Sequence, residues 1–211
     1  MGYAGHARHA WFGCGQCGVM WPIKLPPPQA WVASDAVFSV AEIDRIVMAG
    51  GAPQDKATVG ANNATDLAYR DSNIRWLPPS PETQWLYEII EDAFYQVNKH
   101  FHLDLELIND LQFTEYDAAY TGKFGAHIDE AYGYHKDHRR ILSMSVQLSE
   151  PDEYDGGELL LYPASLSPVT TPKRRGLASF FRSHVIHEVT PVTRGVRKSL
   201  VAWACGPKGK Y

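Results

Sequence analysis

The chain has 211 residues, of which 45% are hydrophobic and 21% charged, with a formal net charge of -4 at pH 7. Its size and composition are typical of one globular domain with a substantial core, and the acidic balance gives no general attraction to nucleic acid or anionic membranes. With three cysteines, no apolar run of membrane-spanning length and no secretory-type apolar segment near residue 1, the sequence predicts a cytoplasmic protein without a disulfide framework.

Residues 1–29 differ in composition from the rest of the chain. Gly, His and Cys are frequent in them, and the stretch ends in KLPPPQ, which is typical of an extended linker. Four of its side chains are ligand types for zinc: His6, His9, Cys14 and Cys17. Their spacing matches no familiar zinc module, so a chance grouping in an N-terminal extension is the alternative. We expect this extension to precede one domain over residues 30–211.

Two amphipathic helices are predicted in the first half of that domain. In FSVAEIDRIVMAGG, Ser39 and Glu42 have the spacing of a capping box, and a Gly pair ends the apolar stripe. In SPETQWLYEIIEDAFYQVNKH, Ser80 is the expected N-cap and Pro81 the first helical residue. We therefore expect helical support over about residues 30–106, packed on one face of a sheet.

From about residue 107 the hydrophobic period changes from that of helices to that of strands. Short β-rich segments follow one another between turn signals: LQFTEY, KFGAHID, RRILSMSVQLS, GELLLY, GLASFF, HVIHEVTPV and RKSLVAWAC. Helices followed by many short strands predict an α+β fold in which an antiparallel sandwich or jelly roll occupies about residues 107–206.

The stretch HIDEAYGYHKD contains the pattern His-x-Asp twice, at residues 127–129 and 135–137. On a strand, the outer two residues of each copy would point to the same side, which suits a shared metal ion. In the first copy Ile128 would then enter the hydrophobic layer, whereas the second copy would bury Lys136, which is costly without a partner. The first copy is the better candidate, and the second reads as loop.

A third ligand is needed, because two side chains do not hold a catalytic metal. His184 and His187 lie in SHVIHEVTPV, and the alternating pattern around His187 favours it without settling the choice. Two histidines and one carboxylate form the facial triad of non-haem Fe(II) oxygen chemistry. The alternative for any single histidine is a structural hydrogen bond in the core.

These segments together resemble the 2-oxoglutarate- and Fe(II)-dependent oxygenases, in the branch similar to prolyl 4-hydroxylase and especially the PKHD-type hydroxylases. The resemblance is carried by QFTEYDAAYTGKFGAHID, RRILSMSVQLS, YDGGELLLY and GLASFFRSHVIHEVTPVTRGVRKSLVAWACG, within about residues 107–206. His-x-Asp alone is weak, but with Gly-Gly-Glu-Leu, a distant His and an Arg ten residues later it is specific.

The resemblance implies a role for several residues of this chain. His127, Asp129 and His187 match the metal ligands, and this match selects His187 over His184. Arg197 matches the residue that pairs with the far carboxylate of 2-oxoglutarate, a fit for a guanidinium. Two further residues match cosubstrate contacts, Ser199 by strand parity and Tyr116 by its place before the metal motif. Tyr120 is the rival of Tyr116, because the family spacing is usually shorter.

The resemblance further implies a double-stranded β-helix that binds Fe(II), uses 2-oxoglutarate and dioxygen, and has ascorbate as a candidate reductant. The reaction would hydroxylate an amino-acid side chain, prolyl or lysyl in a protein or peptide, with release of succinate and CO2. A substrate lid is expected in the loop after the metal motif, formed by Tyr132, Tyr134 and His135.

Three alternatives stay open at this point. The same chemistry would serve a free amino acid or a small metabolite, and no motif decides between these substrates. A jelly-roll module that keeps the fold but not the catalysis is the alternative from another class, and it would be marked by the loss of a ligand, of which none is missing. A cupin-like metalloprotein that uses no keto acid is the third, and Arg197 argues against it because a buried arginine needs a partner. Neither nucleic acid nor membrane is an expected partner.

Overall fold

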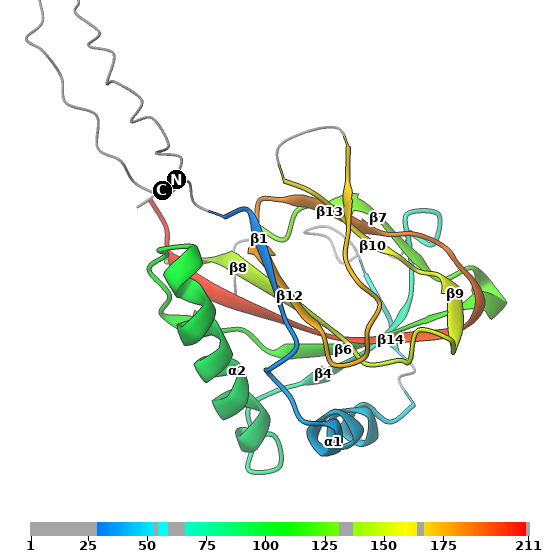
Figure 1. Ribbon diagram of the computed structural model, residues 1–211, viewed down its shortest axis with the longest axis horizontal. Coiled ribbons are helices and arrows are strands. Elements are labelled where there is room, and N and C mark those ends of the chain that lie inside the picture. The colour runs from blue at the N-terminus through cyan, green and yellow to red at the C-terminus, as the bar shows by residue number, and fades with distance from the viewer. Residues whose placement is uncertain (1–28, 53–54, 59–65, 131–136, 164–166, 210–211) are drawn as a thin grey trace, which may run out of the picture.

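The structure is a computed structural model that describes residues 29–52, 55–58, 66–130, 137–163 and 167–209. In these residues two antiparallel sheets face one another, and the two α-helices lie outside the larger sheet (Figure 1). Residues 1–28 lie outside the described part, so the division into an extension over 1–29 and one domain over 30–211 stays a prediction. No helix within the described part combines the length and apolar character needed to cross a membrane.

The larger sheet has the strand order β1-β12-β8-β14-β6-β4-β2 within the described residues, and β5 and β9 each pair with β14. Its strands are β1 (Trp31–Ser34), β2 (Asp55–Lys56), β4 (Asn73–Leu77), β5 (Leu107–Ile108), β6 (Leu111–Asp117), β8 (His138–Gln147), β9 (Tyr154–Gly156), β12 (Ala178–Arg182) and β14 (Val192–Pro207).

The smaller sheet has the order β11-β10-β13-β7-β3 in the same described residues. Its strands are β3 (Arg70–Asp71), β7 (Lys123–His127), β10 (Leu159–Tyr162), β11 (Val169–Thr170) and β13 (Ile186–Val189). The prediction of a strand-rich second half is confirmed, but four strands come from the segment expected to be helical support. That segment therefore extends both sheets as well as supplying helices.

Helix α1 (Val40–Gly50) begins with the predicted capping box. The Ser39 hydroxyl accepts from the Glu42 amide, and the Glu42 carboxylate accepts from the Ser39 amide at 2.7 Å. Helix α2 (Gln84–Val97) starts later than predicted, with Thr83 rather than Ser80 as its N-cap. The reason is local: the Thr83 hydroxyl accepts from the Ser80 amide and donates to the Pro78 carbonyl, which holds these residues in a turn. Two short 3-10 turns, η1 (Asn98–His100) and η2 (Ala118–Tyr120), complete the described elements.

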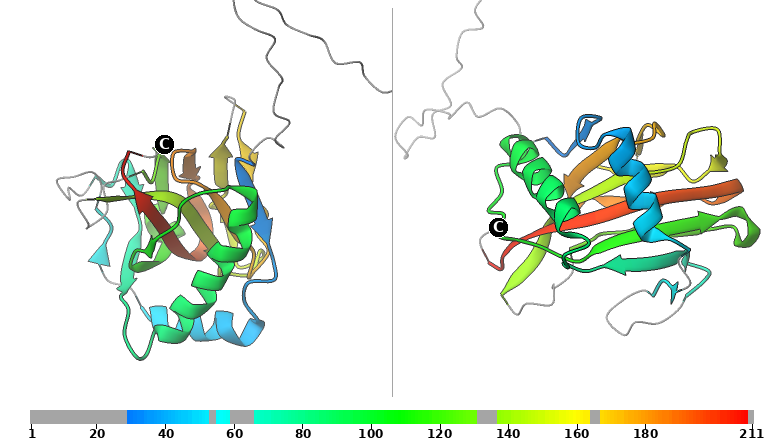
Figure 2. Two further views of the ribbon diagram at one scale, coloured as in Figure 1. Left: turned by 90° about the vertical axis from the view of Figure 1, so that its left-hand side faces the viewer. Right: turned by 90° about the horizontal axis from the view of Figure 1, so that it is seen from below.

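Apolar side chains of both helices belong to one buried cluster with side chains of the larger sheet. Figure 2 shows the two helices beside that sheet from two directions. This cluster includes Ile46, Leu86, Ile90, Phe94, Phe113, Met144, Leu200 and Ala202. Because side chains alternate along a strand, the neighbours of Leu200 and Ala202 in β14 face the smaller sheet instead. Ser199 and Trp203 therefore point into the space between the two sheets.

Candidate active site

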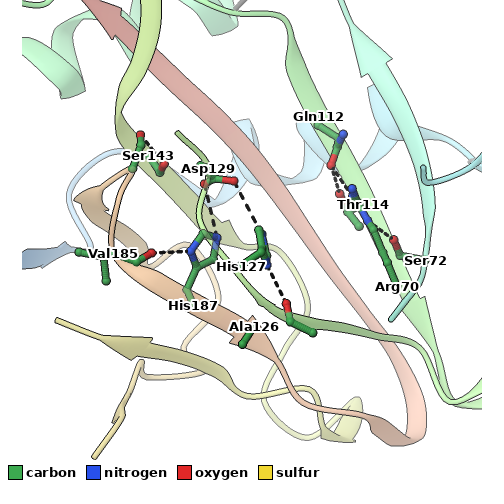
Figure 3. Close-up of polar contacts among 12 residues, drawn as sticks. Arg70, Ser72, Gln112, Thr114, Ala126, His127, Asp129, Ser143, Val185 and His187 are labelled. Atoms are coloured by element: carbon green, nitrogen blue, oxygen red, sulfur yellow. Dashed lines mark hydrogen bonds and ion pairs between the residues drawn. The ribbon is translucent and has the colours of Figure 1, made fainter. Parts of the chain in front are cut away.

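His127, Asp129 and His187 come together between the two sheets. His127 ends β7, Asp129 follows two residues later, and His187 lies on the neighbouring strand β13, directly paired with His127. One ligand atom of each residue lies within 4.8 Å of those of the other two, and the three side chains point toward one another (Figure 3). Asp129 and His187 are buried, and His127 is half-buried.

The hydrogen bonds of the two histidines determine which ring nitrogen faces Asp129. Nδ1 of His127 lies 2.8 Å from the Gly125 carbonyl, and Nδ1 of His187 lies 3.0 Å from the Val185 carbonyl. A carbonyl oxygen only accepts, so both Nδ1 atoms carry the proton. In the neutral rings each Nε2 therefore presents a lone pair toward the carboxylate. Such carbonyl contacts are typical of metal-binding histidines.

Asp129 does not lie on the strand, contrary to the expectation from the His-x-Asp pattern. Strand β7 ends at His127, and Ile128 is 48% exposed rather than buried in a hydrophobic layer. The Asp129 amide instead donates to the Ser183 carbonyl at 2.8 Å, which turns the chain so that the carboxylate points inward. The physical reason is that strand pairing has stopped after His127, so the backbone amide of Asp129 bonds to a carbonyl of the neighbouring turn instead.

The arrangement fits a cation. The Asp129 carboxylate lies 3.7 Å from His127 Nε2 and 3.4 Å from His187 Nε2, and its Oδ2 is buried without a hydrogen-bond partner in the described residues. Burial and the neighbouring His187 lower the pKa of His127 to about 4, so this ring is neutral near pH 7. Lone pairs and a carboxylate that converge without a proton between them are stabilised by a metal ion.

Aromatic rings lie on both sides of the histidine pair, one of them stacked and the other tilted. The ring centroids of Phe124 and His127 are 3.6 Å apart with an interplanar angle of 19°, and those of His127 and His187 are 4.1 Å apart. Phe181 then lies 4.6 Å from His187 on the other side. These contacts restrict the orientation of both imidazoles. His184, the rival third ligand, is exposed in the turn before β13 and takes no part in this column.

A second polar centre surrounds Arg197, which is only 3% exposed. Its guanidinium lies 3.4 Å from the Ser199 hydroxyl and 5.3 Å from the centroid of the Tyr116 ring. Tyr120 lies elsewhere, with its ring under the Lys56 ammonium and its hydroxyl donating to the Glu115 carbonyl. The described residues include every Asp and Glu of the chain, and none of them forms an ion pair with Arg197. Its surroundings thus suit an anion from outside the chain.

Two polar residues near Arg197 escaped the sequence analysis. Tyr154 is buried beside the guanidinium, and its hydroxyl accepts from Gln147 Nε2 at 2.6 Å. Burial raises the pKa of Tyr154, while the Arg197 charge opposes this rise. A tyrosine and a glutamine carry no functional signal in the sequence by themselves. Gln147 pairs with Ser199, however, so strand parity could have placed its side chain on the same interior face.

Trp203 is a further residue that the sequence did not single out. Its indole Nε1 is buried without a hydrogen-bond partner among the described residues, as is Asp129 Oδ2. Burial raises the pKa of Asp129, but His187, His127 and the Trp203 indole together hold it below the usual value. A donor and an acceptor that both lack partners thus lie at the same site.

Seven of the predicted residues cannot be placed. The expected lid residues Tyr132, Tyr134 and His135 and the expected zinc ligands His6, His9, Cys14 and Cys17 all lie outside the described residues. Both hypotheses stay predictions.

The sequence profile of the 2OG-Fe(II) oxygenase superfamily matches residues 111–205. A PKHD-type hydroxylase of a Synechococcus species is 30% identical over 173 residues, which cover 79% of this chain and 74% of that protein. The chain belongs to the PKHD-type hydroxylases of this superfamily. Another PKHD-type hydroxylase, from Acidovorax ebreus, is 40% identical over 87 residues, which are 39% of this chain and only 37% of that relative's length. The predicted resemblance is confirmed.

Solved structures show the same fold. A Pseudomonas putida prolyl-4-hydroxylase is 22% identical with a TM-score of 0.62, and the match covers 83% of this chain and 92% of that one. A prolyl hydroxylase from Trichoplax adhaerens, solved with a peptide fragment of hypoxia inducible factor, is 16% identical with a TM-score of 0.65 and 83% coverage of both chains. PKHD-type hydroxylases, as 2OG-Fe(II) oxygenases, use Fe(II) and 2-oxoglutarate, and the triad and Arg197 are suited to the two groups.

Proposed function

We propose that the protein is an Fe(II)- and 2-oxoglutarate-dependent dioxygenase that hydroxylates an amino-acid side chain, prolyl or lysyl, in a protein or peptide. The observation that carries this proposal is the convergence of His127, Asp129 and His187 within 4.8 Å, together with a buried Arg197 that forms no ion pair with an Asp or Glu of the chain. The curated name of the relatives and the peptide bound by the Trichoplax protein support the choice of substrate class.

The chain's own side chains divide the work between two centres. His127, Asp129 and His187 would hold the iron, which when bound supplies the oxidative decarboxylation of 2-oxoglutarate to succinate and CO2 coupled to hydroxylation by dioxygen. Arg197 and Ser199 would hold the far carboxylate of 2-oxoglutarate, with Tyr116 beside it. The facing sheets would fix the two centres relative to one another.

A free amino acid or a small metabolite is the second candidate substrate, and it would use the same two centres. The proposed lid bears on this choice. Replacing Tyr132 and Tyr134 by Ala should raise the Michaelis constant for the true substrate and leave iron binding intact. Unchanged kinetics in that variant would remove the lid from the proposal.

The proposal is tested by adding Fe(II) and then 2-oxoglutarate to the protein without oxygen. A weak visible charge-transfer band of the chelated keto acid is expected, and it should weaken in Arg197→Ala. His127→Ala, Asp129→Ala and His187→Ala should each lose iron, whereas the exposed His184→Ala and the second-copy variant Asp137→Ala should keep it. A folded, iron-loaded protein that forms no band would favour a cupin-like or non-catalytic module. Where the band forms, screening peptides and amino acids for coupled succinate release would identify the substrate.

A further inference from the structure

Strand β7 has an irregular register just before His127. His187 of β13 lies opposite His127, and Val189 lies opposite Phe124, so two residue steps on β13 match three on β7. Strand β7 therefore contains a β-bulge, one extra residue, between Phe124 and His127. Residues three apart point to opposite faces of a regular strand, but the bulge brings these two side chains onto the same face.

The Phe124 ring covers one face of the His127 imidazole, with 3.6 Å between the ring centroids. An imidazole turns about its Cβ–Cγ bond within a broad energy minimum, so neighbouring groups decide its orientation. The hydrogen bond between His127 Nδ1 and the Gly125 carbonyl is one restraint, and Gly125 belongs to the bulge itself. The direction of His127 Nε2 therefore depends on the shape of the bulge and on the position of the Phe124 ring.

Tyr69 contacts the bulge with both its backbone and its side chain. Its hydroxyl donates to the Ala126 carbonyl at 2.6 Å, and its carbonyl accepts from the Gly125 amide at 2.8 Å. A Cβ atom at position 125 would lie only 2.6 Å from the Tyr69 ring, so a glycine is needed for this close contact. The Tyr69 ring also meets the Phe124 ring edge to face, with the centroids 5.8 Å apart. Tyr69 thus restrains the bulge and the phenyl ring together.

Arg70 lies on the other side of the Phe124 ring. The two residues are paired between β3 and β7, and the guanidinium carbon lies 4.2 Å from the ring centroid. Because the His127 imidazole occupies one face of the ring, the guanidinium takes the opposite face, where a cation is attracted electrostatically. In Figure 3 His127 lies between Arg70 and His187. The order of the side chains is therefore cation, phenyl ring and imidazole.

The Arg70 guanidinium is itself held in place. It is 8% exposed, and three segments of the chain supply its acceptors. The guanidinium donates to Gln112 Oε1 at 2.9 Å, to Ser72 Oγ at 3.2 Å and to the Thr58 carbonyl at 3.3 Å. These hydrogen bonds fix the plane against which the Phe124 ring rests, so Arg70 limits how far that ring can move away from the imidazole.

We propose that Tyr69 and Arg70 are positioning residues of the metal centre. Tyr69 fixes the bulge, Arg70 keeps the Phe124 ring stacked on His127, and together they direct His127 Nε2 toward the metal. The inference rests on the metal centre of the proposed function. If instead these residues only hold β3 against β7, their replacement would change the stability of the fold and leave the metal affinity of the folded protein unaltered.

The charge of Arg70 and its positioning role act on metal affinity in opposite directions. A guanidinium close to a metal ligand repels a divalent cation, so loss of the charge alone would tighten metal binding. Loss of positioning weakens metal binding, because the imidazole then has to be ordered when the metal binds. The sign of the change in affinity therefore separates the two effects.

Mn(II) is the probe for the test, and the electron paramagnetic resonance signal of free Mn(II) gives its dissociation constant. Arg70→Gln should raise this constant about tenfold, as is typical of removing a residue that orients a ligand. Arg70→Lys keeps a cation over the ring and should retain most of the affinity. Tyr69→Phe removes only the hydroxyl and should raise the constant about threefold.

Two variants of the same residue types serve as controls. Arg75 is exposed on β4, and the Tyr162 hydroxyl bonds to Glu188. Arg75→Gln and Tyr162→Phe should therefore bind Mn(II) as the unsubstituted protein does. The visible absorption spectrum of Co(II)-loaded protein is recorded for every variant, because it reports the geometry of the ligands and does not depend on stability. We expect it to change in Arg70→Gln and Tyr69→Phe and in neither control.

A double variant tests whether Arg70 acts through the phenyl ring. Phe124→Leu keeps an apolar side chain and removes the aromatic face, so it should weaken Mn(II) binding by itself. Adding Arg70→Gln to Phe124→Leu should then cause little further loss, because the contact through which Arg70 acts is already gone. Losses that add in full would show that Arg70 does not act through Phe124, and would overturn its assigned role.

The remaining outcomes are equally decisive. Mn(II) binding that is unchanged or tighter in Arg70→Gln and unchanged in Tyr69→Phe, with only the free energy of unfolding in urea lowered, would overturn the proposal. The keto-acid band with Fe(II) is recorded on the unsubstituted protein in parallel. A protein that binds Mn(II) and forms this band, but whose variants bind Mn(II) equally well, refutes this inference alone, whereas an unsubstituted protein that binds neither metal refutes the proposed function.

Discussion

Gly157 lies against Arg197, and a Cβ atom at position 157 would come within 3.0 Å of Arg197 Cδ. The glycine has a φ of +62°, and its preceding neighbour Gly156 has a φ of +72°. The Gly-Gly pair of the sequence motif therefore has a spatial purpose. It allows the backbone to pass closely beside the side chain of Arg197, whose guanidinium we assign to 2-oxoglutarate.

Gly157→Ala should weaken 2-oxoglutarate binding as well as stability. The left-handed backbone costs an alanine roughly 1 kcal/mol, and the added methyl group must also displace Val192 or Arg197. Gly209→Ala is the matched control, because Gly209 also has a positive φ but has open space around its missing Cβ. Urea unfolding and 2-oxoglutarate titration of the anaerobic band provide the two readouts. Equal behaviour of both variants in the titration would contradict the role of Gly157.

Tyr154→Phe should raise the dissociation constant of 2-oxoglutarate by up to about tenfold, since it removes a buried hydroxyl beside Arg197 and leaves Gln147 without its acceptor. Tyr162→Phe serves as the comparison, because that hydroxyl bonds to Glu188 away from Arg197. The band titration measures both. If the two variants bind 2-oxoglutarate as the unsubstituted protein does, Tyr154 has only a packing role.

Trp203→Phe should lower metal affinity about tenfold, the effect typical of removing an outer-shell donor to a ligand. The Trp203 indole lowers the pKa of Asp129, and its Nε1 is buried without a hydrogen-bond partner among the described residues, as is Asp129 Oδ2. Trp76→Phe is the control, since it alters the same aromatic pair and leaves Trp203 in place. Free Mn(II), followed by electron paramagnetic resonance during titration, reports the affinity. Equal losses in both variants would point to the aromatic packing instead.

The metal-free protein should lose stability as the pH falls from about 6.5 toward 4. The pKa of His127 is about 4 in the folded protein, below its ordinary value of 6.5, so the unfolded chain binds more protons in this range. The contribution of His127 is thus present above pH 6.5 and is lost on acidification, by roughly 2 kcal/mol between pH 7 and pH 5. Urea unfolding at the two pH values measures it, with metal chelated throughout.

A variant and a spectrum check the assignment of this pH dependence to His127. His127→Gln should remove most of it, while His184→Gln should not, because His184 is exposed. Histidine NMR should show the His127 ring neutral at pH 7. A His127 ring that titrates near its ordinary value would refute the prediction.

The strands and the first helix were predictable because each depends on short-range patterns. Alternating apolar residues mark β6, β8 and β14, and Ser39 with Glu42 marks the start of α1. The start of α2 was not predictable in this way, because the Thr83 side chain formed a local turn where Ser80 offered an equally good cap. Where two capping residues compete, only the folded turn decides between them.

The sequence by itself determined the pattern of chemistry: His-x-Asp, a later His and an Arg ten residues on. Tertiary structure alone decided how Asp129 turns inward, because its backbone partner Ser183 is distant in sequence. It also decided that Tyr154 and Trp203 belong to the site. Those residues enter it through contacts between strands far apart along the chain, and no local periodicity encodes such contacts.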